Sequence, residues 1–165
     1  MSIIPKLIEE LYDANEWAAC RELSISYLNH EENEEILFLL GGVYENEKKY
    51  DKALECIDKI KNKNHNLLIN KARCLYFLCR APEAEEIIRS LPSEYRQDNK
   101  IQIDLALYLT AQGKIEEAEA ILDPLAHIED KAAFNYGWFL LAKDKLQEGY
   151  KHIRAGAKDE LRIWG

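Results

Sequence analysis

Histidines and carboxylates are the first side chains of this sequence that could carry chemistry. Its four histidines are His30, His65, His127 and His152. None has a second histidine or a cysteine three or four residues away, the pair that a helical metal site most often uses. The acidic runs EENEE (31–35) and EAEE (83–86) are typical of helix starts, where negative charge is favourable. We therefore expect no metal, no cofactor and no catalytic carboxylate pair.

Cysteines are the other reactive side chains, and their spacing is irregular. They stand at Cys20, Cys56, Cys74 and Cys79, without a C-x-x-C pair. This favours reduced thiols in a cytoplasmic protein. Cys74 and Cys79 fall on one predicted helix, pointing to different faces, and we expect buried structural cysteines. The sequence also lacks G-x-x-x-x-G-K-[ST], G-x-G-x-x-G and G-x-S-x-G, so we expect no enzyme.

The composition favours helices as the elements that position these residues. Of 165 residues, 47% are hydrophobic and 32% charged, with only 4 prolines and 7 glycines. That balance is typical of an all-α globular protein. The net charge of −8 argues against nucleic acid as a partner. The acidic start, MSIIPKLIEELYDANEW, and the absence of a long apolar run argue against a signal peptide or a membrane span.

A pattern recurs along the chain. Each copy has a small residue, an aromatic residue or leucine three positions on, a polar turn, an apolar residue, and a second small residue three positions later. The copies span 8–24, 41–57, 72–88, 106–122 and 137–153. The first copy is the weakest, with Ile8 at its first small position. The second small residues are Cys20, Ala53, Ala84, Ala118 and Gly149, spaced by 33, 31, 34 and 31 residues.

This repetition resembles the tetratricopeptide repeat (TPR), a helix–turn–helix unit of about 34 residues. The second copy matches best, with Leu37, Leu40-Gly41, Tyr44, Tyr50 and Ala53 at the motif positions. The resemblance implies an all-α solenoid of about five repeats, a right-handed superhelix whose concave groove is lined by the first helix of each repeat. The expected repeats are 1–33, 34–64, 65–98, 99–129 and 130–165, and without a Pro-, Gly- or Ser-rich linker we expect one domain, 1–165.

The repeats predict ten helices and explain two glycines. The predicted ranges are 3–13, 16–29, 34–46, 50–62, 66–79, 82–91, 99–112, 115–125, 130–142 and 146–157. Asn46, Gly113 and Asp144 are expected to head turns, and 92–99 to be the longest loop. Gly137 and Gly149 lie inside predicted helices at a cost of about 1 kcal/mol each relative to alanine. We expect them to mark a helix crossing where only a small residue lets the backbones approach.

The resemblance also implies a peptide-binding face. In the TPR register the groove-facing residues of the second copy are Glu35, Phe38, Leu39, Gly42, Glu45 and Asn46. Those of the fourth copy are Lys100, Ile103, Asp104, Leu107, Thr110 and Ala111. From the later copies the expected peptide-binding residues are Asn70, Arg73, Tyr76, Phe77, Asp104, Asn135 and Trp138. The aromatic residues would anchor a helix or an extended peptide, the asparagines would hold its backbone, and Arg73 would engage an acidic side chain.

Two interpretations of this face remain to be separated. The alternative is that Phe38, Phe77, Phe134 and Trp138 pack as core. The clamp of TPR co-chaperones that bind chaperone tails needs lysine, asparagine and arginine at set positions of three consecutive repeats. It is not expected here, because no register supplies the cationic residues and position 6 carries Leu39, Asn70, Asp104 and Asn135. Asp104 would repel a carboxylate.

The last copy is also similar to TPR arms that bacterial proteins join to glycosyltransferase domains. The matching residues are Asn135, Gly137, Leu140, Gly149-Tyr150, Arg154 and Trp164-Gly165. Three functions follow: a protein- or peptide-binding scaffold without catalysis, the substrate-recognition arm of a glycosyltransferase whose catalytic domain is absent from this chain, or an assembly or secretion chaperone. Self-association through an uncapped end is a further alternative.

Overall fold

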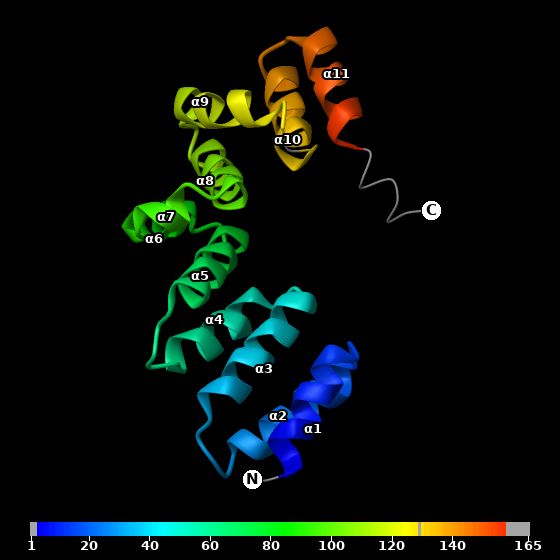
Figure 1. Ribbon diagram of the computed structural model, residues 1–165, viewed down its shortest axis with the longest axis vertical. Helices are drawn as coiled ribbons and strands as arrows, with labels where there is room; N and C mark the ends of the chain where they lie inside the picture. The colour runs from blue at the N-terminus through cyan, green and yellow to red at the C-terminus, as the bar shows by residue number, and fades with distance from the viewer. Residues whose placement is uncertain (1–2, 129, 158–165) are drawn as a thin grey trace. The chain divides into compact units, whose positions relative to one another are not determined.

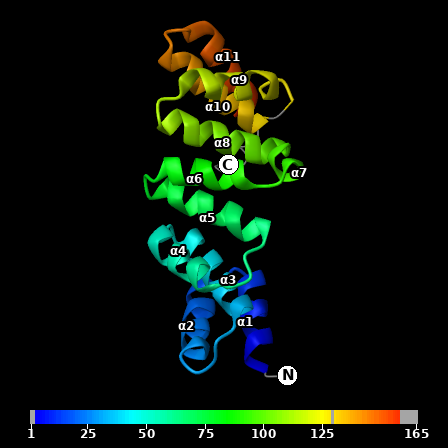
Figure 2. The same cartoon turned by 90° about the vertical axis from the view of Figure 1, so that its left-hand side faces the viewer.

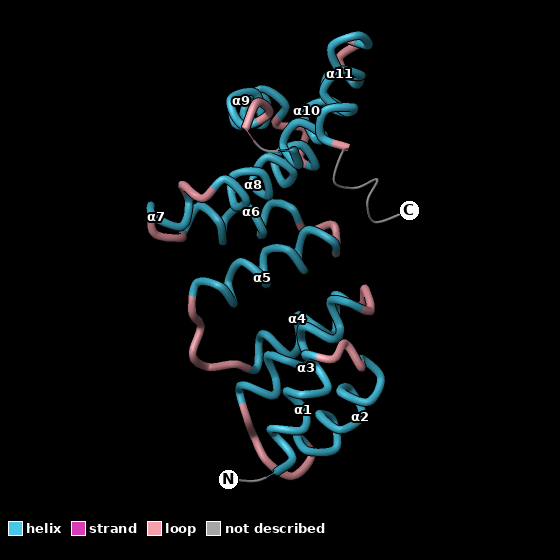
Figure 3. Tube along the Cα trace, turned by 45° about the vertical axis from the view of Figure 1, so that its right-hand side comes forward, coloured by secondary structure: helices cyan, strands magenta, loops and turns pink. Residues whose placement is uncertain are grey.

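The computed structural model describes residues 3–128 and 130–157, which form helices joined by short loops (Figure 3). Its helices are α1 (Ile3–Asp13), α2 (Trp17–Leu28), α3 (Glu34–Asn46), α4 (Tyr50–Lys59), α5 (His65–Phe77), α6 (Ala81–Ser90), α7 (Ser93–Arg96), α8 (Asn99–Ala111), α9 (Ile115–Leu125), α10 (Asp130–Ala142) and α11 (Leu146–Gly156). All ten predicted helices are present, and no strand occurs in the described ranges. The all-α fold is thus confirmed.

One expected loop is instead partly helical. Residues 92–99 contain the one-turn helix α7, which begins directly after Pro92. Pro92 has the extended conformation (φ −55°, ψ 152°) that a residue preceding a helix adopts, and four residues are enough for a single turn. The prediction of an unstructured loop was therefore wrong over Ser93–Arg96.

The chain divides into two compact units, 1–80 and 81–165. In the first unit α1 packs on α2 and α3 packs on α4, as antiparallel pairs (Figure 2). In the second unit α8 packs on α9, and α10 on α11. The boundary between the units falls inside the third predicted repeat, and the single domain stays a prediction.

Each repeat turns at a residue with a left-handed backbone. These residues are Asn15, Lys48, Cys79, Gly113 and Asp144, with φ between 58° and 73°. Each precedes the second small residue of its repeat by five positions, so the structure reproduces the spacing of the pattern. Gly113 and Asp144 were expected at turns, but Asn46 still belongs to α3 and Lys48 adopts the left-handed conformation instead.

In three repeats, the first helix begins after a residue whose side chain caps it. The Asn33 side chain accepts hydrogen bonds from the amides of Glu35 and Ile36 at 2.9 and 3.1 Å. Asn64 accepts one from the Leu67 amide at 2.9 Å, and Asp98 accepts one at 2.8 Å from the second residue of α8. Such caps satisfy amides that have no partner inside the helix, which fixes where α3, α5 and α8 start.

The helices α10 and α11 of the last repeat pack on each other (Figure 1), with Gly137 on α10 and Gly149 on α11. A Cβ on Gly137 would lie 2.7 Å from the carbonyl oxygen of Gly149, and a Cβ on Gly149 would lie 2.8 Å from the carbonyl oxygen of Gly137. Both distances are too short for a carbon–oxygen contact. The expected role of these glycines is therefore confirmed: their missing side chains allow backbone contact between the two helices.

The core of each unit is built from the small residues of the second helices and apolar residues of the first. Cys20, Ala53, Ala84 and Ala118 are fully buried. Ile103, which the TPR register placed on the groove, is only 1% exposed and belongs to the core of the second unit. No helix in 3–128 or 130–157 combines the length and apolar character that crossing a membrane requires.

Candidate functional site

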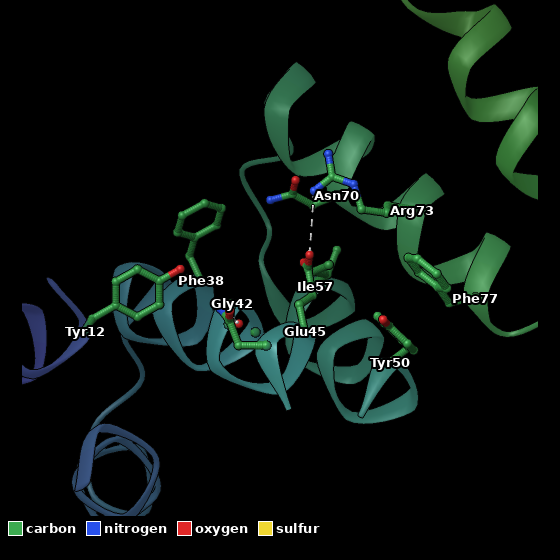
Figure 4. Close-up of a pocket in the computed structure, with 11 residues that line it drawn as sticks. Tyr12, Phe38, Gly42, Glu45, Tyr50, Ile57, Asn70, Arg73 and Phe77 are labelled. Carbon is green, nitrogen blue, oxygen red and sulfur yellow. Dashed lines mark hydrogen bonds and ion pairs between the residues drawn. The ribbon is translucent and has the colours of Figure 1, made fainter. Parts of the chain in front are cut away.

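In the first unit a cavity of about 390 Å³ lies between α1, α3, α4 and α5 (Figure 4). We call it the groove cavity. Four aromatic rings, two amides, one carboxylate and one guanidinium are among its lining groups. The lining residues are Tyr12, Phe38, Gly41, Gly42, Glu45, Asn46, Tyr50, Ile57, Asn70, Arg73 and Phe77.

Helical spacing places these residues on the cavity. On α3, Phe38, Gly42 and Glu45 are four and then three residues apart, so they share one face of the helix. Ile36, Leu40 and Val43 follow the same spacing and are buried on another face. On α5, Asn70, Arg73 and Phe77 share a face in the same way. The register thus brings together three of the predicted binding residues.

Gly42 determines where the ring of Tyr12 lies. A Cβ on Gly42 would overlap the Tyr12 hydroxyl, so the glycine leaves room for this ring against α3. The other side of the ring contacts Trp17 edge-on, with centroids 5.4 Å apart. Burial and the nearby Glu45 carboxylate raise the pKa of Tyr12, which keeps its hydroxyl protonated and able to donate.

Large apolar rings are exposed in and beside the groove cavity. Phe38 is 43% exposed and Phe77 is 49% exposed, although Phe77 stacks on Tyr50 with centroids 4.4 Å apart. In the second unit Trp138 is 56% exposed, and the half-buried Phe134 contacts it edge-on. The alternative that these residues pack as core is therefore wrong for Phe38, Phe77 and Trp138.

The charged pair of the groove cavity is formed by Glu45 and Arg73. Arg73 Nη1 lies 3.9 Å from Glu45 Oε2, and the two side chains are 44% and 18% exposed. Burial raises the pKa of Glu45, while the charge of Arg73 and the hydrogen bond from the Cys74 thiol act in the opposite direction. Arg73 was expected to await an acidic ligand, but the structure places it beside a carboxylate of the chain itself.

The remaining predicted residues lie elsewhere. Tyr76 is half-buried, 5.3 Å from Phe77 by ring centroids, and does not line the groove cavity. Asn135 and Trp138 line a different cavity of about 420 Å³ in the second unit, between α8, α9 and α10. Asp104 accepts a hydrogen bond from Lys131 at 3.1 Å and lines neither cavity. The structure thus brings together Asn70, Arg73 and Phe77, and separately Asn135 and Trp138.

Sequence reasoning did not select several lining residues, among them Glu45, Tyr12 and Tyr50. Glu45 stood at a groove-facing position of the TPR register but was not among the expected peptide-binding residues. Tyr12 belongs to the copy that matches the repeat least, and Tyr50 begins a second helix. The periodic exposure of α3 could have singled out Glu45, whereas Tyr12 and Tyr50 approach the cavity only through packing between helices.

The cysteines lie outside this arrangement except for Cys74. Cys20, Cys56 and Cys74 are buried, and burial raises the pKa of Cys56 to about 11 and that of Cys74 to about 12. Cys79 is exposed, contrary to expectation, because α5 ends at Phe77 and Cys79 stands in the turn. All four are free thiols, and no three His, Cys, Asp or Glu side chains of the described residues are grouped to hold a metal ion.

Solved structures with a similar fold include TPR proteins. MamA residues 41 to the end, from Desulfovibrio magneticus RS-1, superposes with a TM-score of 0.79 at 14% identity, covering 97% of this chain and 94% of that one. YrrB, a TPR protein with an unusual peptide-binding site, gives 0.69 at 14% identity over 92% of this chain and 82% of that one. A TPR protein from Parabacteroides merdae ATCC 43184 gives 0.70 at 19% identity, over 93% and 63%.

No protein-family model matches the sequence, and no curated protein matches it significantly. The similarity of this chain to known proteins is therefore one of fold. Helix–turn–helix repeats with this spacing, the left-handed turn residues and the superpositions agree with one another. The chain has the fold of a TPR-like α-solenoid.

Proposed function

We propose that this chain is a non-catalytic, cytoplasmic scaffold that binds an extended segment of a partner protein in the groove cavity of its first unit. The observation that carries the proposal is the pair of half-exposed rings, Phe38 and Phe77, beside the hydrogen-bonding side chains of Asn70, Glu45 and Arg73. Exposed aromatic residues next to polar groups are typical of surfaces where a few residues provide most of the binding energy.

Each group has a role in this proposal. Phe38 and the stacked pair of Tyr50 and Phe77 supply apolar contact area for side chains of the segment. The Asn70 amide both donates and accepts, so it can bind the N–H and C=O groups of an extended backbone. YrrB supports the proposal by analogy, since a protein of the same fold has a peptide-binding site.

The other interpretations have less support. A chaperone that masks an apolar helix needs a largely apolar surface, whereas the groove cavity contains Glu45 and Arg73. The glycosyltransferase arm stays a prediction, without support from the structures compared. Of its residues, Gly137 and Gly149 are explained by the crossing of α10 and α11, and Trp164-Gly165 lie outside the described residues. Self-association also stays a prediction.

A peptide selection tests the proposal without a known partner. A phage-displayed library of random dodecapeptides is selected on the whole chain, and enriched peptides are measured by fluorescence anisotropy. Replacing Asn70 and Phe77 together by alanine should weaken binding by about 1–3 kcal/mol, because these side chains contact the peptide. The control is Asn135→Ala with Trp138→Ala, which alters only the cavity of the second unit.

The outcome is interpreted after a folding check by circular dichroism. Loss of affinity in the first variant and retention in the control support the proposal. Binding that the Asn70→Ala/Phe77→Ala variant retains would rule out the groove cavity as the site.

A further inference from the structure

We infer that the segment bound in the groove cavity is basic, and that one lysine or arginine side chain of it is seated between the aromatic rings against Glu45. The inference rests on the proposed function and adds the chemical class of the partner. It begins from a carboxylate that the chain leaves incompletely paired.

Glu45 has few donors around it. Its nearest cationic atom is Arg73 Nη1 at 3.9 Å, beyond the distance of a direct hydrogen bond. The Cys74 thiol is a weak donor, and the amide of the neighbouring Asn46 donates to the carbonyl oxygen of Gly42 at 3.0 Å instead. The Glu45 side chain is 18% exposed, so a ligand that enters the groove cavity can reach its carboxylate. A cationic side chain of a ligand would supply further donors.

The walls around Glu45 suit a cation. Tyr12 and Phe38 lie to one side of the carboxylate and Tyr50 and Phe77 to the other (Figure 4). The face of an aromatic ring attracts a lysine or arginine side chain electrostatically, and the attraction increases where water is excluded. Rings combined with one carboxylate therefore select a cation over an acidic side chain.

The surface next to the groove cavity is negatively charged, as Glu45 is. Phe38 also lines a second cavity of about 470 Å³ in the first unit, which contains Glu9, Glu34 and Glu35 and no basic residue. Together the two cavities are lined by four carboxylates, Glu9, Glu34, Glu35 and Glu45, and by one cationic side chain, Arg73. This charge favours a segment with several basic residues.

Arg73 acquires a different role from the one expected. An acidic side chain that reached Arg73 would also approach Glu45, 3.9 Å away, and would be repelled. Arg73 instead competes with a ligand cation for Glu45. Removing the charge of Arg73 should therefore strengthen binding of a basic peptide, whereas an acid-binding groove predicts weaker binding.

The peptide selection described above distinguishes this inference from the proposed function. Enrichment of lysine or arginine at one position supports the inference. Enrichment of aspartate or glutamate overturns it but leaves a peptide-binding groove. Peptides whose binding does not depend on Asn70 and Phe77 overturn both.

Matched variants then identify Glu45. The probes are the selected peptide and the same peptide with its basic residue replaced by glutamine. Glu45→Gln should weaken the basic peptide about tenfold to hundredfold, the range of a lost charge-assisted hydrogen bond, and should leave the glutamine peptide unchanged. Arg73→Met should tighten the basic peptide a fewfold. Glu55→Gln, on an exposed part of α4 outside the groove cavity, is the control and should change neither.

Two results would refute the role of Glu45 even if a basic peptide is selected. One is an equal effect of Glu45→Gln on both peptides, which indicates a change of groove shape without charge recognition. The other is weaker binding to the Arg73→Met variant. Unfolding of Glu45→Gln is not expected, because burial already disfavours the charged form of this side chain.

Discussion

Glu85 is a buried carboxylate of the second unit that three side chains hold in place. It is 7% exposed and lies on α6. It accepts hydrogen bonds of 2.7 Å from Arg89 one turn later on α6, and from Gln112 and Lys114 in the turn between α8 and α9. The carboxylate thereby ties α6 to the start of α9.

The pKa of Glu85 gives the size of its contribution to the free energy of unfolding. Burial by itself would raise this pKa, but the hydrogen bonds from Lys114, Arg89 and Gln112 outweigh burial and lower it from 4.5 to about 2. Because the folded-state pKa is depressed, the stabilisation is fully present above the unfolded-state value and is lost as the pH falls towards 2. At about 1.4 kcal/mol per pKa unit, the ionised group contributes about 3 kcal/mol at pH 7 and about 1.4 kcal/mol at pH 3.

Replacing Glu85 by glutamine removes the charge and keeps the shape. We expect the free energy of unfolding to fall by about 2–4 kcal/mol at pH 7, and the difference from the wild type to shrink as the pH is lowered. Urea denaturation at a series of pH values measures this difference. Glu86→Gln, at an exposed position of the same helix, is the matched control and should change little. A difference that does not vary with pH, or one equal to that of the control, would refute the reasoning.

Two further predictions concern packing and thiol access. Gly137→Ala should lower the free energy of unfolding by about 1–3 kcal/mol, since its Cβ would meet the Gly149 backbone, whereas Gly41→Ala, whose Cβ would lie 3.6 Å from Cys56, should be neutral or stabilising by up to about 1 kcal/mol. Thermal unfolding compares the two, and equal losses would contradict the close crossing of α10 and α11. A thiol reagent at neutral pH should label Cys79 at once and Cys74 only after unfolding, because Cys79 is exposed and burial raises the pKa of Cys74 to about 12. Mass spectrometry of the labelled peptides checks this, and rapid labelling of Cys74 would contradict its burial.

The sequence by itself determined the helices and their repeat. The small residues from Cys20 to Gly149 recur at a spacing typical of TPR units, and the helices and left-handed turn residues follow that spacing. It also indicated why residues 137 and 149 are glycines. Glycine destabilises a helix relative to alanine, so its presence inside a predicted helix indicates that another helix packs closely there. These inferences succeed because helix periodicity, turns and small crossing residues are local properties of the chain.

Only the tertiary structure decided how side chains from different helices meet. Arg73 and Phe77 were expected on the groove, but the position of Arg73 beside Glu45, and that of Phe77 on Tyr50, depend on how α3, α4 and α5 pack. Burial of Ile103 likewise follows from the rotation of its helix against its neighbours. The repeat pattern predicts which face of its helix a residue occupies, but it does not predict the exact rotation of that helix about its axis. Pairing at 3–4 Å depends on small rotations and shifts between helices, which the close packing of the whole unit determines.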